Sequence, residues 1–329
     1  MSMPKFLLRR TLQGIFVIWG VVTVLFVLRA VSPGDPATLM LGEGANQELI
    51  QQVRAEEGLN DPIFVQYADY ITDLVTGDLG YSWRSNREVE AMVIERIPAT
   101  LELSIAATIV AISIAVPMGV ISATRREQLS DYGATLFSLL GISTPNFWLG
   151  LMLILVLGVW VGIFPTGRRA VGFGEALMTL VGTGSPGELL TWLEYIALPA
   201  LTLGTYFTAL ITRLTRSGMI DELGKPYVKA TQAKGLPLVL TRYKHVLRNT
   251  MIPIITVLGL QMGTLMGGAV ITETVFNWPG LGQRFVDALG IRDWPLMQGI
   301  ILFVAISFVV INIVVDALYT YLDPQVSVE

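Results

Sequence analysis

The sequence predicts an all-α integral membrane protein with six transmembrane helices. Hydrophobic residues make up 53% of its 329 residues, whereas charged residues make up only 15%; an ordinary soluble domain has about 25% charged residues. Apolar runs of about 20 residues, the length that crosses a bilayer as a helix, recur along the chain. The polar segments between them differ in sign, some being rich in acidic and others in basic residues. Because basic loops stay on the cytoplasmic side, these signs also predict the orientation.

The first transmembrane helix is expected over residues 12–28, after a basic start in residues 1–10. A secretory signal peptide also combines a basic start with an apolar run. The run here is too long for a typical signal core, and no small-x-small cleavage site follows it cleanly. We therefore expect a helix whose N-terminus is inside the cell and which closes at Arg29 and Pro33.

Residues 32–98 form a polar segment that is expected on the outer side. The segment contains twelve acidic residues and only four arginines, the opposite of the basic excess of cytoplasmic loops. We interpret the acidity as a solvated surface; adaptation to high salt is the alternative. Two short amphipathic helices are expected within it, over residues 47–57 and 63–74.

Three further transmembrane segments follow from the apolar runs of the middle of the chain. The second span is expected over residues 99–123, with Arg125 and Arg126 at its inner end. The third span is expected over residues 135–162 and is broken near Pro145, and the Gly-rich residues 164–194 after it are expected outside. The fourth span is expected over residues 195–212 and ends at Arg213 and Arg216.

Residues 221–253 form the segment around which the rest of the chain is organised. Every charged side chain of residues 224–253 is basic, so this loop is expected in the cytoplasm. Pro226 suits the first turn of a short helix, and Gly235 suits its left-handed end. A second helix is then expected over residues 237–248.

A short helix, a glycine turn and a second helix form a compact protrusion that is suited to docking in a groove of another protein. An interfacial pair of amphipathic helices held by anionic lipid is the alternative.

The loop carries an ordered set of residues that identifies a family. The pattern is Tyr227-Val228-x-Ala230-x-x-Ala233-Lys234-Gly235-Leu236, then His245-x-Leu247-Arg248-Asn249 and Ile252-Pro253. It resembles the cytoplasmic coupling loop, or EAA loop, of ABC importer permeases, in particular those of dipeptide and oligopeptide importers. The usual leading glutamate is Lys229 here and the second alanine is Thr231, which argues against a salt bridge that needs the acid. The resemblance favours docking over the lipid alternative.

Four other motifs resemble the same permeases. They are Pro33-Gly34-Asp35-Pro36, Gly77-Asp78-Leu79-Gly80-x-Ser82, Glu273-x-Val275-Phe276-x-x-Pro279-Gly280-Leu281-Gly282 and Arg292-Asp293-x-Pro295-x-x-Gln298-Gly299. The resemblance therefore covers residues 33–324. It implies a fold like that of type I ABC importer permeases, with a helical extracytoplasmic segment and a cytoplasmic coupling loop.

The resemblance also implies partners. A second permease subunit, two cytoplasmic ABC ATPase subunits and an extracytoplasmic solute-binding protein would complete the importer within the lipid membrane. Tyr227, Ala230 and Gly235 are the expected docking surface for an ATPase. The resembled branch carries dipeptides, oligopeptides, nickel chelates, glutathione and some sugars; peptides are the expected substrate here, and no residue is identified as a substrate ligand.

The fifth span is expected over residues 254–276 and contains Gly259, Gly263 and Gly267 at four-residue spacing. Small residues repeated in this way let helices approach closely in lipid. The glycine face either packs within this subunit or lines the pathway and contacts a second permease. The sixth span is expected over residues 300–321.

Several kinds of chemistry are missing from the sequence. It has no cysteine and a single histidine, His245, and it lacks the G-x-x-x-x-G-K-[ST] run that binds nucleotide phosphates. We therefore expect no catalytic, cofactor or metal site and no nucleic-acid partner, and ATP hydrolysis must come from partner subunits. Ionisable groups in spans are functional candidates, so an ion-coupled secondary transporter using Glu102, Glu273 or Asp316 is the alternative function.

The expected organisation has four parts. Residues 1–31 contain the cytoplasmic N-terminus and the first helix, and residues 32–98 are extracytoplasmic. Residues 99–322 form a five-helix permease core with its coupling loop at 213–252, and residues 323–329 are a cytoplasmic tail. Both termini are thus expected on the cytoplasmic side of a cell membrane.

Overall fold

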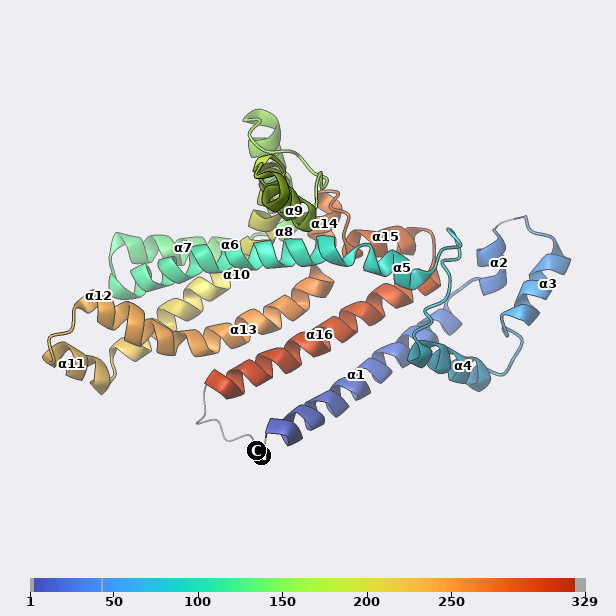
Figure 1. The fold of residues 1–329 in the computed structure, drawn as a ribbon, viewed down its shortest axis with the longest axis horizontal. Helices are drawn as coiled ribbons and strands as arrows, with labels where there is room; N and C mark the ends of the chain where they lie inside the picture. The colour runs from blue at the N-terminus through green and yellow to red at the C-terminus, as the bar shows by residue number, and fades with distance from the viewer. Residues whose placement is uncertain (1–2, 43, 323–329) are drawn as a thin grey trace.

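A computed structural model describes residues 3–42 and 44–322, and the regular secondary structure of these residues is helical (Figure 1). Four of its helices are long and apolar enough to cross a membrane: Lys5–Val31, Val89–Thr124, Gly187–Leu223 and Trp294–Ala317. Two bent helix pairs pass the same test, which gives up to six spans if each pair is one span. The predicted six-span, all-α class is therefore confirmed.

The N-terminal part contains α1 (Met3–Val31), α2 (Pro36–Leu41), α3 (Gln47–Glu56) and α4 (Ile63–Thr76). The two amphipathic helices expected from the sequence correspond to α3 and α4. The sequence analysis did not anticipate α2, which begins where the Asp35 side chain accepts a hydrogen bond from the Thr38 N–H. Asp35 also pairs with Arg54 at 3.2 Å, which joins α2 to α3.

The core lies between α6 (Ile97–Thr124) and α10 (Gly187–Leu223). An alanine or leucine faces α10 at every fourth position of α6, and the buried set is Ala99, Leu103, Ala107, Ala111 and Ala115. Side chains this small bring the two backbones together: a Cβ on Gly204 of α10 would lie 2.9 Å from the Ala107 carbonyl oxygen. In lipid, such close contact is the main source of helix association.

The third and fourth spans differ from the prediction. The third begins earlier, as α7 (Leu129–Ser143), and then turns by 105° into α8 (Asn146–Leu153) and the π-helical stretch η1 (Ile154–Trp160). Pro145 causes the turn, because the residue before a proline is driven out of the helical region, and Thr144 is extended at φ −84° and ψ 124°.

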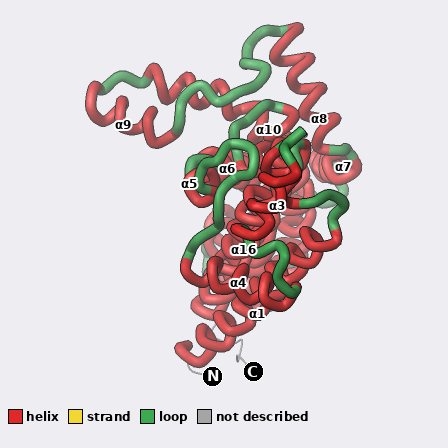
Figure 2. Tube along the Cα trace, turned by 90° about the vertical axis from the view of Figure 1, so that its right-hand side faces the viewer, coloured by secondary structure: helices red, strands yellow, loops and turns green. Residues whose placement is uncertain are grey.

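The fourth span, α10, begins at Gly187 rather than at residue 195 and ends at Leu223 rather than at residue 212. Its first turns and α9 (Phe173–Thr183) occupy the segment expected to be an outer loop. Figures 1 and 2 show α9 projecting from the helix bundle.

The fifth span also differs from the prediction. After α11 (Pro226–Ala233), a continuous helical path runs through α12 (Leu238–Leu240), the π-helical stretch η2 (Thr241–Val246) and α13 (Leu247–Gly268). The second loop helix therefore does not end near residue 248 but leads directly into the membrane helix, with a bend of 49° between Leu238–Met251 and Pro253–Leu265. The span itself ends at Gly268, followed by the short α14 (Val270–Val275).

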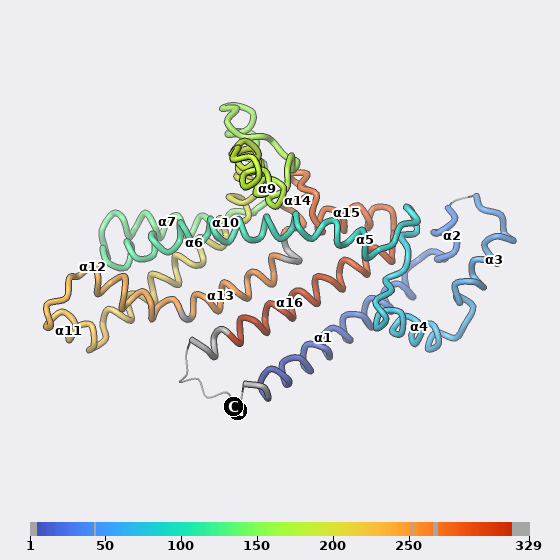
Figure 3. The backbone as a smooth tube through the Cα atoms, in the orientation of Figure 1, coloured from blue at the N-terminus to red at the C-terminus, as the bar shows by residue number. Residues whose placement is uncertain are grey.

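The C-terminal part contains α15 (Leu281–Gly290) and α16 (Trp294–Leu322), and α5 (Val89–Ile94) packs near their junction. The predicted tail, residues 323–329, lies outside the described residues. Figures 1 and 3 show α11 and α12 at one end of the bundle and α2, α3 and α4 at the opposite end. The basic loop and the acidic segment thus lie at opposite ends.

Candidate functional site

The short helix of the basic loop is closed at both ends by local interactions. Pro226 is the first residue of α11, and Gly235 follows its end with φ +78°. Two backbone hydrogen bonds close the helix there: the Leu236 N–H donates to Thr231 O at 3.2 Å and the Gly235 N–H donates to Gln232 O at 2.9 Å. This pair of bonds is a Schellman motif. The predicted proline start and glycine end of the helix are therefore confirmed.

One face of α11 is attached to the bundle. Val228 is 2% exposed and packs in a cluster with Val120, Met219 and Val246, so it links α11 to α6, α10 and η2. Removing a valine side chain from water contributes about 1.5–3 kcal/mol. The side chain of Val228 therefore serves as an anchor rather than as part of the outer surface.

The Tyr227 side chain is a second attachment. Its hydroxyl donates to Glu222 Oε2 at 2.7 Å and accepts from Asn249 Nδ2 at 3.2 Å. Glu222 also pairs with Lys225. Burial, and then the hydrogen bond to Glu222, raise the pKa of the Tyr227 hydroxyl above its ordinary value. The structure thus holds Tyr227 between α10 and α13, with its hydroxyl turned toward these helices. Glu222 was not predicted as a functional residue, although an acidic residue five positions before Tyr227 was the available signal.

The other face of α11 is exposed. The exposed residues of the predicted pattern are Lys229, Ala230, Ala233, Lys234 and Gly235, and Leu236 is half-buried. Four large apolar side chains continue this surface and were not anticipated: Leu238 is 53% exposed, Val239 66%, Leu240 42% and Tyr243 52%. A mixed basic and apolar surface of this kind, at the end of the bundle, is suited to contact with another protein.

His245 and Arg248 lie apart from the exposed face of α11. They line a cavity of ≈ 550 Å³ with Tyr227, Lys244, Asn249, Met251 and Ile255. The predicted loop residues therefore fall into two groups. One group lies on the exposed face of α11, and the other, His245 and Arg248, lines a basic cavity beside α13.

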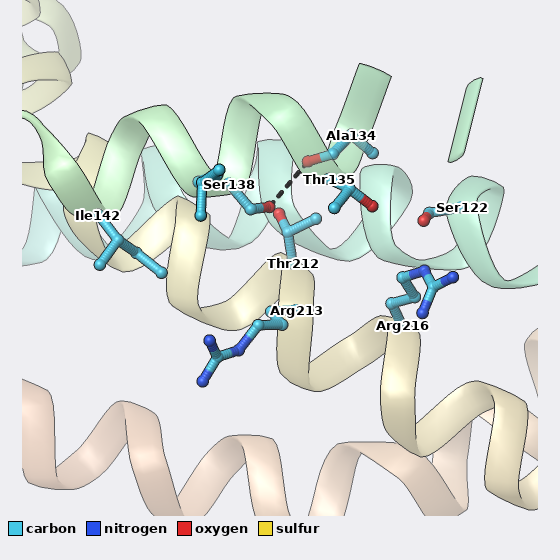
Figure 4. A pocket seen from close by; sticks show the side chains of 9 residues that line it. Ser122, Ala134, Thr135, Ser138, Ile142, Thr212, Arg213 and Arg216 are labelled. Carbon is cyan, nitrogen blue, oxygen red and sulfur yellow. Dashed lines mark hydrogen bonds between the residues drawn. The ribbon is translucent and has the colours of Figure 1, made fainter. Parts of the chain in front are cut away.

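The C-terminal part of α10, which leads into this loop, is held to the bundle by an ion pair. Arg216 donates two hydrogen bonds to Asp131 of α7, at 2.6 and 2.9 Å, and Ser122 of α6 donates one at 2.5 Å. Asp131 is 4% exposed. Next to it is a cavity of ≈ 230 Å³ between α6, α7 and α10, lined by the residues drawn in Figure 4. Three helices are thus held together just before α10 leads into α11.

Two of the three predicted glycines of the fifth span, Gly259 and Gly263, face α16. A Cβ on Gly259 would collide with the side chain of Val315, and one on Gly263 would lie 2.8 Å from Phe308 Cδ2. These contacts favour packing within the chain over the pathway or partner alternative. Gly267 lies in α13, but its surroundings are outside what the structure describes.

The three carboxylates considered for ion coupling, Glu102, Glu273 and Asp316, have partners in the structure. Glu102 accepts two hydrogen bonds from Arg169, at 3.0 and 2.7 Å. Asp316 pairs with Arg10 of α1 at 3.1 Å, and Glu273, 0% exposed, accepts from the Thr100 hydroxyl at 2.8 Å. Contacts of this kind are typical of ionisable side chains that have a structural role at the end of a membrane helix or on its bundle-facing side.

Tertiary structure brings together motifs that are far apart in sequence. The Gly77–Ser82 motif meets the Arg292–Gly299 motif through the pair Ser82 and Asp293, both of which are buried. Within the third motif, Gly280 lies against the carboxylate of Glu273, so that a Cβ at this position would overlap it. No sequence signal specifies either pairing.

Comparison with known proteins places the sequence in context. The model of the family described as binding-protein-dependent transport system inner membrane component matches residues 115–328, and that of the N-terminal part of such membrane components matches residues 3–104. The chain is 38% identical to the dipeptide transport system permease protein DppB of Escherichia coli K12, over 98% of this chain and 99% of the relative. It is 39% identical to the oligopeptide transport system permease protein AppB of Bacillus subtilis, with the same coverage.

Solved structures show a similar fold. An inward-facing structure of the MetNI methionine ABC transporter contains a chain that matches 70% of this one, with 96% of its own length covered. The TM-score is 0.54 at 16% sequence identity, so this likeness concerns the fold alone.

Proposed function

The chain belongs to the family of binding-protein-dependent transport system inner membrane components, and we propose that it carries di- or oligopeptides into the cell. As a member, it is a multi-pass membrane permease of an ABC importer. The ion-coupled alternative considered for Glu102, Glu273 and Asp316 is therefore wrong. The peptide substrate is supported by the relatives named for dipeptides and oligopeptides.

We infer that α11 is the element on which an ATPase acts. The observation that carries this inference is its two-sided construction: Val228 and Tyr227 fasten one face to the bundle, while Ala230, Ala233 and Lys234 leave the other face open. A helix that is fixed on one side and open on the other transmits the displacement of a partner as a rigid lever. A partner shifts the permease between inward-facing and outward-facing states only through contacts that differ between these states.

The displacement has a direct path into the membrane. It passes from α11 along α10, which is tied to α6 and α7 by Arg216, Asp131 and Ser122. It also passes along η2, which leads without a loop into α13. The importer would contain a second permease, two ATPase subunits and an extracytoplasmic solute-binding protein, with both termini of this chain in the cytoplasm.

Site-directed cross-linking tests this proposal cleanly, because the sequence contains no cysteine. A single cysteine at Ala233 in the assembled importer should cross-link to a P-loop ATPase, identified by mass spectrometry. A cysteine at Ala68, an exposed position of α4, is the matched control and should instead react with a membrane-impermeant maleimide from outside. ATP-dependent uptake of alanyl-alanine with the cognate binding protein tests the substrate. Recovery of a homo-oligomer without an ATPase would overturn the proposal.

A further inference from the structure

A cavity of ≈ 290 Å³ lies at the outer end of α1, between the acidic segment and the beginning of α16. Its lining includes Arg29, Glu57, Tyr70, Asp73, Asp78 and Trp83. It therefore combines one cation, three carboxylates and aromatic side chains. Pockets for small ligands typically measure about 300–1,000 Å³, so this one suits a ligand at the small end of that range.

The walls of the cavity are held in place by specific contacts. On α1, Thr23 hydrogen-bonds to the Tyr67 hydroxyl at 2.7 Å, and the ring of Phe26 stacks on that of Tyr70 with centroids 5.6 Å apart. Arg29 follows at the same helical spacing, so these three residues of α1 share one face. On the far side, the backbone N–H of Trp83 donates to Asp293 at 3.2 Å. The cavity is thus formed before any ligand arrives.

The cation at the base of the cavity lacks a strong partner. The Arg29 side chain is half-buried and makes no hydrogen bond or ion pair with any residue in the described part of the chain, and Tyr70 and Glu57 act on it only through longer-range electrostatic attraction. A guanidinium that has lost part of its hydration is stabilised by an anion, and its planar fork of donors matches a carboxylate. The structure therefore presents an open position for an anionic group at Arg29.

The remaining charges have the opposite sign. Glu57, Asp73 and Asp78 line the same cavity, and these acids suit an ammonium group. Burial raises the pKa of the Tyr70 hydroxyl to about 12, an effect that the nearby Arg29 cation only partly offsets. Tyr70 therefore keeps its proton at neutral pH and can donate a hydrogen bond.

We propose that this cavity is a binding site for the zwitterionic backbone of a short peptide, with the peptide carboxylate on Arg29 and the ammonium group among the three acids. The proposal rests on the peptide substrate inferred above. The phosphate of an outer-leaflet lipid is the competing anion for an arginine at a helix end, but three carboxylates around the site repel a phosphodiester. A site here would hold peptide at the outer mouth of the permease.

The first test needs only the unaltered protein. The assembled importer is placed in lipid nanodiscs without its solute-binding protein, and equilibrium binding of radiolabelled alanyl-alanine is measured. Saturable binding is expected. The C-terminal amide and the N-acetyl derivative should each compete at least about tenfold more weakly, because each removes one charge-assisted interaction. Equal competition by the amide would overturn the assignment to Arg29.

Matched variants test the named residues. Arg29→Gln should weaken alanyl-alanine binding at least about tenfold. Arg84→Gln should not change it, because Arg84 is exposed, lies outside the cavity lining and donates to the Ile291 carbonyl oxygen at 3.4 Å. Asp73→Asn should weaken binding, and Asp69→Asn, one helical turn earlier on α4 and outside the cavity, should leave it unchanged.

The outcomes separate this proposal from the function on which it rests. If the importer takes up dipeptide but shows no measurable peptide binding in nanodiscs, the proposed peptide site is overturned and the proposed transport function is not. If peptide binds at the cavity but is not taken up in an ATP-dependent manner, the proposed transport substrate is overturned and the proposed peptide site is not. A third outcome is that the importer binds no peptide but captures its solute-binding protein, and that Arg29→Gln abolishes this capture. The cavity would then be a contact site for that protein, and the proposal would be overturned.

Discussion

The Ser82 hydroxyl donates a hydrogen bond of 2.5 Å to the carboxylate of Asp293, a residue 211 positions later in the chain. Asp293 is 1% exposed and also accepts from the Trp83 N–H. The end of the acidic segment is thereby fixed to the residue that precedes α16. This pair links the acidic segment to the membrane helices, and a buried carboxylate such as that of Asp293 needs hydrogen-bond partners of this kind.

Replacing Asp293 by alanine should destabilise the protein by about 2–3 kcal/mol, since it leaves the Ser82 hydroxyl and the Trp83 N–H without their acceptor. The midpoint of heat-induced aggregation in detergent measures the loss. Asp287→Ala, at an exposed position of α15, is the control and should stay near wild type. An equal shift in both variants would argue against a special role of the buried pair.

Gly280 provides a second test at the same end of the helix bundle. Glu273 accepts hydrogen bonds from Thr100 at 2.8 Å and from the Gln283 N–H at 3.0 Å, and its carboxylate fills the space next to Gly280. Gly280→Ala should therefore displace the carboxylate and lower stability by about 1–3 kcal/mol, the usual cost of overpacking. Gly290→Ala has open space around it and should be neutral in the same thermal assay. A neutral Gly280→Ala would mean that α15 can move away freely.

Gly235 is expected to control coupling rather than assembly. Its φ of +78° costs an ordinary residue roughly 1–2 kcal/mol, and a β-branched side chain suits it least. Gly235→Val should distort the end of α11 and reduce the peptide uptake per ATP hydrolysed. Gly235→Asn should reduce this ratio less, because asparagine tolerates a positive φ. The ratio of uptake to ATPase activity in proteoliposomes is the measurement. Wild-type coupling in Gly235→Val would disprove the rigid-lever role of α11.

The packing of α13 on α16 can be tested by a double-mutant cycle. Gly259→Ala should clash with Val315 and destabilise the chain by about 1–3 kcal/mol. Val315→Ala should relieve much of this loss in the double variant, because residues in contact are not additive. Thermal midpoints of the four proteins measure the interaction. Strict additivity would instead favour the alternative in which these glycines face a partner or the pathway.

The sequence by itself determined the class of the protein and the two ends of the short loop helix α11. Apolar run length and charge were enough for the six spans, and an amphipathic pattern indicated α3 and α4. Turn chemistry was enough for α11, because Pro226 and Gly235 act on backbone groups a few residues away. Such interactions are local, so the pattern that produces them can be read directly.

Only the tertiary structure decided which side chains meet. The length of α10 and the continuity of η2 with α13 depend on packing, which overrides the polar residues that seemed to end these helices. The pairs Ser82–Asp293 and Arg216–Asp131 join elements that are far apart in the sequence. Their partners are set by how helices cross in space, and no periodicity along the chain records that arrangement.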